Sequence, residues 1–125
     1  ELMHTEHNEL IVDAYNANPT SMKAALDNFK LINHPHKMLI LGEMRELGIT
    51  SGAEHQKVAE QALSLGCEEV WFVGEEFQPY AADARWFPDA EAVKVALKGG
   101  DAPTERLILV KGSNSTKLYE LPAFL

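Results

Sequence analysis

The chain has 125 residues, of which 46% are hydrophobic and 24% are charged, a composition typical of one soluble globular domain with its own core. Nineteen acidic and eleven basic residues give a formal net charge of −8, and no cluster of lysine and arginine occurs, which excludes nucleic acid as a partner. The longest apolar runs are too short to span a membrane, and the N-terminus lacks the pattern of a signal peptide. A single cysteine, Cys67, cannot form an internal disulfide, which favours a reducing compartment.

The first third of the sequence predicts an antiparallel hairpin, a helix and a buried strand. Residues 1–4 and 10–13 flank a polar turn, so we expect the first strand to pair antiparallel with the second. A helix is predicted over residues 19–31, because Asn18 can cap its first turn, Pro19 suits the first helical position, and apolar residues recur at helical spacing. Residues 37–41 read Lys-Met-Leu-Ile-Leu, a pattern typical of a strand that is covered on both faces.

The rest of the sequence alternates helices with strands. We predict that Ser51 and Glu54 form a capping box, which begins a helix that ends at Gly66. Next come a strand at residues 70–73, a short helix around Phe77 and a brief strand at residues 85–87. A helix capped by Asp89, a last central strand at residues 107–110 and an amphipathic tail complete the chain. This alternation predicts an α/β fold: a Rossmann-like three-layer domain with a mostly parallel sheet, an antiparallel N-terminal strand and helices on both faces.

Polar loops follow the predicted strands. The carboxyl ends of parallel strands meet at one edge of a sheet, where open α/β domains bind their ligands. We therefore expect residues 13–18, 42–48, 74–76 and 111–115 to gather there, and three of these loops are rich in glycine, hydroxyl, amide or charged groups. The chain lacks the phosphate-binding motifs G-x-x-x-x-G-K-[ST] and G-x-G-x-x-G, so it does not form a complete NTPase or dehydrogenase by itself.

Several side chains at this edge have two interpretations. Glu43 and Glu46 are either solvent-facing acids or part of a ligand site, and His55 is either a buried structural histidine or part of the substrate edge. Lys111 follows four apolar residues, which favours an anionic ligand close to its ammonium group. We predict no metal site in this chain, because no metal-ligand spacing is formed by the remaining histidines, His4, His7, His34 and His36.

The motifs at this edge resemble those of one enzyme family. In chain order they are Tyr15-Asn16-Ala17-Asn18-Pro19 with Ser21-Met22, Gly42-Glu43-Met44-Arg45-Glu46-Leu47-Gly48, His55, and Leu109-Val110-Lys111-Gly112-Ser113. Over nearly the whole chain, they resemble the C-terminal domain of a Mur ligase. The Asn-Ala-Asn-Pro corner is similar to that of the family member that adds D-alanyl-D-alanine, whereas sister ligases and folylpolyglutamate synthases usually carry an Asp-x-Ala-His-x-Pro type of corner.

This resemblance implies a three-domain enzyme of cytoplasmic peptidoglycan synthesis, with residues 1–125 as its C-terminal domain and the N-terminal UDP-binding and central ATPase domains absent. The start at Glu1, without an initiator methionine, agrees with that expectation. In the reaction implied, ATP phosphorylates the carboxylate of UDP-N-acetylmuramoyl-tripeptide to an acyl phosphate. The amine of D-alanyl-D-alanine attacks this group, and phosphate leaves as the amide forms. ATP and Mg²⁺ are the implied cofactors, bound mainly by the central domain. We therefore expect a monomer, no catalytic residue in this chain, and no ligase turnover by the chain alone.

The resemblance also implies roles for individual residues. It implies nucleotide contacts at the first corner, by Asp13, Tyr15, Asn16 and Asn18. It implies amino-substrate contacts at the other loops, by Glu43, Arg45, Glu46, His55, Lys111, Ser113 and Asn114. Asn114 departs from the family pattern, because many relatives have a basic residue after Gly-Ser. Two alternatives stay open: another Mur or folylpolyglutamate-type ligase domain, or a stand-alone α/β ligand-binding domain.

Overall fold

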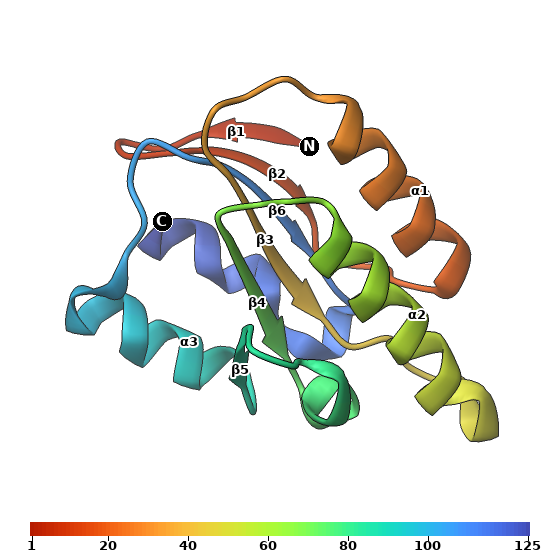
Figure 1. Cartoon of the computed structure of the whole chain (residues 1–125). Helices are drawn as coiled ribbons and strands as arrows, with labels where there is room; N and C mark the ends of the chain where they lie inside the picture. Colours follow the sequence, from red (N-terminus) through yellow and green to blue (C-terminus); the bar gives the residue numbers. More distant parts are fainter.

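Six strands form one sheet, in the order β1-β2-β6-β3-β4-β5, in the computed structural model, which describes all 125 residues (Figure 1). β1 pairs antiparallel with β2, and every other neighbouring pair is parallel. This topology confirms the predicted sheet with its antiparallel N-terminal strand. The strands are β1 (Leu2–His4), β2 (Glu9–Asp13), β3 (Lys37–Gly42), β4 (Glu69–Val73), β5 (Arg85–Phe87) and β6 (Leu107–Lys111).

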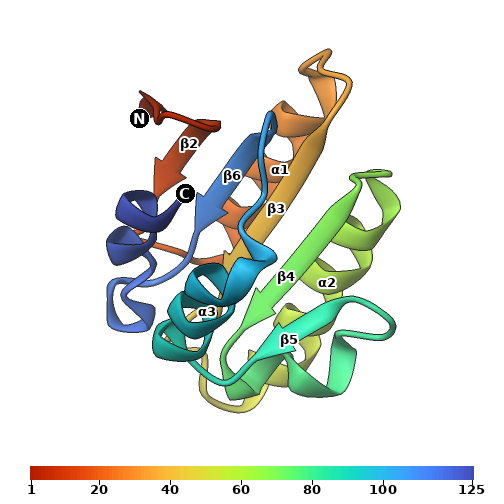
Figure 2. The same cartoon turned by 90° about the vertical axis from the view of Figure 1, so that its left-hand side faces the viewer.

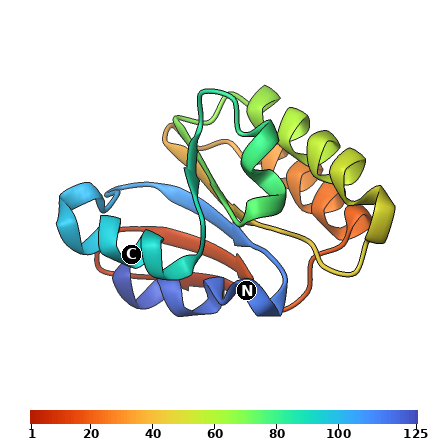
Figure 3. The same cartoon turned by 90° about the horizontal axis from the view of Figure 1, so that it is seen from below.

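Helices cover both faces of the sheet, which gives the three layers seen in Figure 3. α1 and α2 lie on one face, and α3 lies on the other together with the last 3₁₀ turns of the chain. No helix is both long enough and apolar enough to cross a bilayer. The α-helices are α1 (Pro19–Leu31), α2 (Ser51–Ser64) and α3 (Ala90–Ala96), and the shorter turns are Gly48–Thr50, Glu75–Tyr80, Leu97–Asp101, Asn114–Thr116 and Leu118–Phe124.

Each face of the sheet has its own apolar cluster, because successive side chains of a strand point to opposite faces. Leu39 and Leu41 of β3 belong to the cluster beneath α1 and α2. Met38 and Ile40 of the same strand belong to the cluster beneath α3. β3 is therefore covered on both faces, as its sequence predicts.

The predicted start of α1 is confirmed. Asn18 has an extended backbone, and its side-chain oxygen accepts a hydrogen bond from the Ser21 amide at 2.9 Å. The Ser21 hydroxyl in turn accepts from the Asn18 amide at 3.0 Å, which completes a capping box that the sequence did not reveal. The helix is thus fixed at the point where the chain leaves β2.

The capping box predicted at Ser51 is wrong. The 3₁₀ turn Gly48–Thr50 runs directly into α2, so Thr50 takes the N-cap position, without a side-chain cap, and Ser51 already has helical angles (φ −54°, ψ −47°). A capping residue needs an extended backbone for its side chain to reach the free amides. The Ser51 hydroxyl instead donates to the Glu76 carboxylate at 2.9 Å, which joins α2 to the loop after β4.

Two predicted helices differ in detail from the structure. The short helix around Phe77 is a 3₁₀ segment, Glu75–Tyr80, with Pro79 inside it. The helix capped by Asp89 is regular only as far as Ala96 and then continues as a wider turn to Asp101. Both differences concern helix type and length, and they leave the order of elements as predicted.

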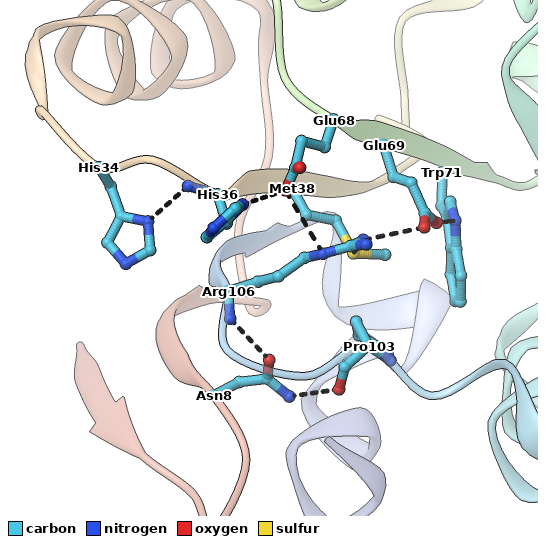
Figure 4. Close-up of polar contacts among 9 residues, drawn as sticks. All are labelled: Asn8, His34, His36, Met38, Glu68, Glu69, Trp71, Pro103 and Arg106. Carbon is cyan, nitrogen blue, oxygen red and sulfur yellow. Dashed lines mark hydrogen bonds and ion pairs between the residues drawn. The ribbon is translucent and has the colours of Figure 1, made fainter.

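Polar contacts join the strands at the amino edge of the sheet, opposite to the predicted ligand edge (Figure 4). Arg106, immediately before β6, forms ion pairs with Glu69 at 2.8 Å and Glu68 at 3.7 Å. The buried Asn8 amide donates to the Pro103 carbonyl at 2.9 Å, and its oxygen accepts from the Arg106 amide at 3.1 Å. These contacts hold the starts of β2, β4 and β6 in register.

Candidate functional site

Four strands end side by side at one edge of the sheet, as the arrowheads of β2, β6, β3 and β4 show in Figure 2. The register pairs Lys111 with both Asp13 and Leu41, and Gly42 with Val73, so the following loops begin at one level. The loops 13–18, 42–48, 74–76 and 111–115 therefore meet as predicted. β3 continues to α2 and β6 continues to the opposite face, which places the topological switch point between these two strands.

The crevice at the switch point is filled by the chain itself. A Cβ atom at Gly42 would lie 2.8 Å from the Thr116 hydroxyl and 2.9 Å from a Leu118 methyl carbon. A Cβ at Gly112 would lie 2.8 Å from the same hydroxyl. The two glycines thus allow the turn 113–118 to fold over the strand ends, and the surface open to ligands lies on either side of this turn.

Lys111 is neutralised within the chain. Its side chain is 1% exposed, and its ammonium group lies 2.5 Å from the Asp13 carboxylate and donates to the Asn16 carbonyl at 3.1 Å. The anion that the sequence requires beside Lys111 is therefore Asp13, from the neighbouring strand, and the ammonium is not open to a bound ligand. The Asp13 side chain itself remains 52% exposed, so its outer oxygen is available at the edge.

The corner after β2 presents an aromatic face and free amides. Tyr15 is 68% exposed and stacks on Tyr119, with ring centroids 5.5 Å apart and an interplanar angle of 8°. One face of Tyr15 is thus supported by the C-terminal turn, while Asn16 is exposed. Asn18 uses its oxygen as the cap of α1, so only its amide nitrogen is left for other contacts. No sequence signal pointed to Tyr119, because the contact joins two distant segments.

Glu43, in the loop that follows β3, is a buried carboxylate on the other side of the turn 113–118 from the corner after β2. Its side chain is 8% exposed, one oxygen accepts from the Glu76 amide at 3.0 Å, and the other is paired with the Arg45 guanidinium at 3.0 Å. The Arg45 side chain is 52% exposed and donates through Nε to the Ser115 hydroxyl at 2.8 Å. Arg45 therefore presents charge to the surface, whereas Glu43 lies behind it.

His55 has no polar atom left for a ligand. It is fully buried, its Nε2 accepts from the Met44 amide at 2.9 Å, and its Nδ1 lies 2.8 Å from the Ser51 carbonyl. An amide can only donate, so Nε2 is unprotonated and the proton is on Nδ1, which gives a neutral imidazole. The ring also packs edge-on against Phe77 at 4.7 Å. This geometry supports the structural interpretation of His55, which anchors the loop 43–48.

A hollow of about 260 Å³ opens beside Arg45, between the loop after β4, the start of α3 and the turn 113–118. Ser113 is buried, with its amide donating to the Glu43 carbonyl at 3.3 Å, whereas Asn114 and Glu46 are exposed, and none of the three lines the hollow. No group of three or more His, Cys, Asp or Glu side chains is arranged to hold a metal ion. The sequence placed Ser115 at this edge, within the loop 111–115, but it did not indicate three other polar residues that line the hollow: Asp89, Glu91 and Lys117.

Fold and edge together define an open α/β domain with a polar edge at the carboxyl ends of its strands and no phosphate-binding loop of its own. The family model described as "Mur ligase, glutamate ligase domain" matches residues 1–114, and the chain belongs to this family.

The curated relatives reported next all carry the name of one member of the Mur ligase family. The UDP-N-acetylmuramoyl-tripeptide–D-alanyl-D-alanine ligase of Bacillus subtilis is 46% identical over 136 residues, which cover 97% of this chain and 29% of that protein. The ligases of the same name from Escherichia coli and Rickettsia prowazekii are 36% and 33% identical, over 93% and 97% of this chain. The chain spans only 26% and 28% of those two proteins.

Solved structures of Mur ligases have a domain with the same fold as this chain. A MurF from Acinetobacter baumannii superposes with a TM-score of 0.77 at 27% identity, over 98% of this chain and 29% of that one. The MurF ligase from Thermotoga maritima, solved in complex with ADP, superposes with a TM-score of 0.79 over the same 98% of this chain. Its identity of 18% makes it evidence for the fold alone.

Proposed function

We propose that this chain is the C-terminal domain of an ATP-dependent ligase that joins D-alanyl-D-alanine to UDP-N-acetylmuramoyl-tripeptide in cytoplasmic peptidoglycan synthesis. The names of the relatives support this activity, and the family assignment supports the domain. The observation that carries the proposal is the convergence of a polar aromatic corner and an exposed, fixed guanidinium at one sheet edge. Such an edge suits two charged ligands that must be brought together.

The corner after β2 is the proposed nucleotide side. The exposed face of Tyr15 can stack on a base, and the outer oxygen of Asp13 and the Asn16 amide can hydrogen-bond sugar hydroxyls or phosphate oxygens. These groups fit part of a nucleotide but lack the phosphate cradle of a P-loop. In this proposal ATP supplies the phosphoryl group that activates the tripeptide carboxylate, while ATP phosphates and Mg²⁺ are bound mainly by the central domain of the full-length protein.

The hollow beside Arg45 is the proposed amino-substrate side. Its volume, about 260 Å³, is just below the roughly 300–1,000 Å³ of pockets for drug-sized ligands, so it suits a small zwitterion such as a dipeptide. Arg45 and Lys117 can hold a carboxylate, and Asp89 and Glu91 can hold an ammonium group. Asn114 and Glu46, exposed on the neighbouring loops, are the proposed further contacts to this substrate, and the buried Ser113 supports Glu43. Lys111 and His55 act here through the loops that they hold.

The contribution of this chain to the reaction is orientation. It offers no activated nucleophile at the edge, whereas holding two reactants in the correct geometry accounts for a large part of the rate of such reactions. The amine of the dipeptide is itself the nucleophile. The role of these residues is therefore to bring that amine close to the activated carboxylate, and we expect a monomer to be sufficient.

The test is the identity of the joined product. The full-length protein is incubated with ATP, Mg²⁺, UDP-N-acetylmuramoyl-tripeptide and D-alanyl-D-alanine, and the product is analysed by mass spectrometry. We expect a product with the mass of both substrates less one water. A product formed only with a different amino substrate would favour another Mur or folylpolyglutamate-type ligase, and no product with any amino substrate would favour a stand-alone binding domain.

A residue-level test uses the ATP dependence of the same reaction. Tyr15→Ala should raise KM for ATP at least fivefold, because stacking on an aromatic ring contributes about 1–3 kcal/mol per base, and KM for the dipeptide should not change. Leu31→Ala is the matched control, since Leu31 is an exposed apolar residue at the far end of α1. An unchanged KM for ATP in Tyr15→Ala would remove Tyr15 from the nucleotide site.

A further inference from the structure

We propose that Glu43 is a positioning residue, which holds the Arg45 guanidinium in place as an anchor for an anionic group of a substrate. This inference rests on the proposed function and refines it. The anion is a carboxylate or phosphoryl oxygen pair, which a guanidinium recognises through parallel N–H groups.

Glu43 is held more rigidly than Arg45. Its carboxylate is 8% exposed and accepts from the Glu76 amide, its own amide donates to the Val73 carbonyl at 3.1 Å, and its carbonyl accepts from Ser113 at 3.3 Å. Glu43 is thereby bonded to the loops after β4 and β6. Its position is set by the sheet, so the exposed Arg45 side chain must adapt to Glu43 and not the reverse.

Gly74 shows how closely the chain is built around the Glu43 carboxylate. A Cβ atom at Gly74 would lie 2.5 Å from Glu43 Cδ and 2.7 Å from Oε2. Gly74 also has φ +111°, a conformation that side chains rarely adopt. The backbone of the β4 loop therefore leaves just enough space for a carboxylate in this one orientation.

Two of the three guanidinium nitrogens of Arg45 have a partner in the chain, and the third has none. Nε donates to Ser115 and Nη2 is paired with Glu43, whereas Nη1 has no partner in the chain. A guanidinium has five N–H donors in a rigid plane, so two fixed points determine where the remaining donors lie. Arg45 is one of the residues that line the hollow of about 260 Å³. Without Glu43 the side chain would sample many rotamers, and binding would have to restrict them.

The experiment is a double-mutant cycle in the full-length protein, with KM measured separately for D-alanyl-D-alanine and for ATP. Glu43→Gln keeps the shape of Glu43 and an acceptor for the Glu76 amide but loses the charge that pairs with Arg45. We expect it to raise one KM about tenfold, as misplacement of a positioning group does, and to leave kcat within about twofold. A rise for the dipeptide identifies a carboxylate as the anion, and a rise for ATP identifies a phosphate.

The Arg45→Ala background separates positioning from a structural role. If Glu43 acts through Arg45, Glu43→Gln adds less than about twofold to KM when Arg45 is already absent. An equal effect in both backgrounds, or unchanged KM values in Glu43→Gln, would overturn the proposal. Glu75→Gln is the matched control, because Glu75 is an exposed acid on the neighbouring loop without a side-chain partner, and it should leave both KM values unchanged.

Two further measurements keep the result independent of folding and of the reaction. Ser115→Ala removes the other contact to Arg45 without disturbing the buried carboxylate, and it should raise the same KM by a smaller factor. In the 125-residue chain, the protons of Arg45 Nη2, the nitrogen paired with Glu43, should give a protected NMR signal that Glu43→Gln abolishes and Glu75→Gln keeps. If the wild-type protein joins no dipeptide, the proposed function fails. If the Arg45 Nη2 signal is unaffected by Glu43→Gln, the positioning role fails.

Discussion

Removing Asp13 should destabilise the domain more than removing Lys111, although Asp13 is the more exposed partner of the pair. Asp13→Ala leaves the Lys111 ammonium buried, 1% exposed, with only the Asn16 carbonyl as partner. An uncompensated buried charge costs about 3–5 kcal/mol, and the remaining carbonyl contact puts the value near the lower limit, about 3 kcal/mol. Lys111→Met leaves a carboxylate that is 52% exposed and can be hydrated, so we expect a loss of only about 0–1.5 kcal/mol.

The assay is urea unfolding of the 125-residue chain, followed by circular dichroism. With a slope of roughly 1–3 kcal/mol per M, the midpoint of Asp13→Ala should fall clearly below that of Lys111→Met. The double variant should be no less stable than Asp13→Ala, because removal of the lysine also removes the buried charge. A Lys111→Met variant that is as unstable as Asp13→Ala would refute the assignment of Asp13 as the group that neutralises Lys111.

Three further predictions concern other parts of the chain. Gly74→Ala should lower the free energy of unfolding in urea by about 2–3 kcal/mol, because the backbone has a positive φ and a Cβ would contact the buried Glu43 carboxylate. Gly99→Ala is the control and should change it by less than about 0.5 kcal/mol, since a Cβ there meets no atom within 4 Å. Equal effects of the two substitutions would contradict the close packing of Gly74 on Glu43. Asn8→Ala should cost about 3 kcal/mol by the same assay, because it leaves buried backbone groups without partners, and a loss below about 1 kcal/mol would show that water replaces them. The hydrogen bond from Lys23 lowers the pKa of Asp27 below its ordinary value of 3.8. This pair therefore stabilises the fold above pH 3.8, and its contribution is lost as the pH falls through the lowered pKa. An NMR titration should show a higher Asp27 pKa in Lys23→Ala, and an unchanged pKa would exclude Lys23 as the cause of the shift.

Local chain chemistry was predictable from the sequence. The start of α1 depends on Asn18, Pro19 and their immediate neighbours, and the predicted boundaries 19–31 agree with the structure. The gathering of four polar loops at one edge was also predictable, because it follows from parallel strand order alone. The capping box at Ser51 failed for a complementary reason: capping requires an extended backbone, and the preceding 3₁₀ turn had already made the chain helical.

Contacts between distant segments were not predictable. The anion beside Lys111 lies 98 residues away in the sequence, and the hydroxyl that orients Arg45 lies 70 residues away. Nothing in either local sequence distinguishes an internal partner from a bound ligand. The same limit applies to Tyr15, whose stacking partner Tyr119 is contributed by the C-terminal turn. The position of the candidate site was therefore predictable from the sequence. Which of its side chains are open to a ligand, and which only hold the loops in place, could be learned only from the structure.

We propose that this edge serves an ATP-dependent ligase specific for D-alanyl-D-alanine. The most direct measurement is ADP release by the full-length protein, with each substrate omitted in turn. We predict rapid release only when both UDP-N-acetylmuramoyl-tripeptide and D-alanyl-D-alanine are present, and no release by the 125-residue chain alone. Release that is independent of the dipeptide, or that requires a different amino substrate, would contradict this function.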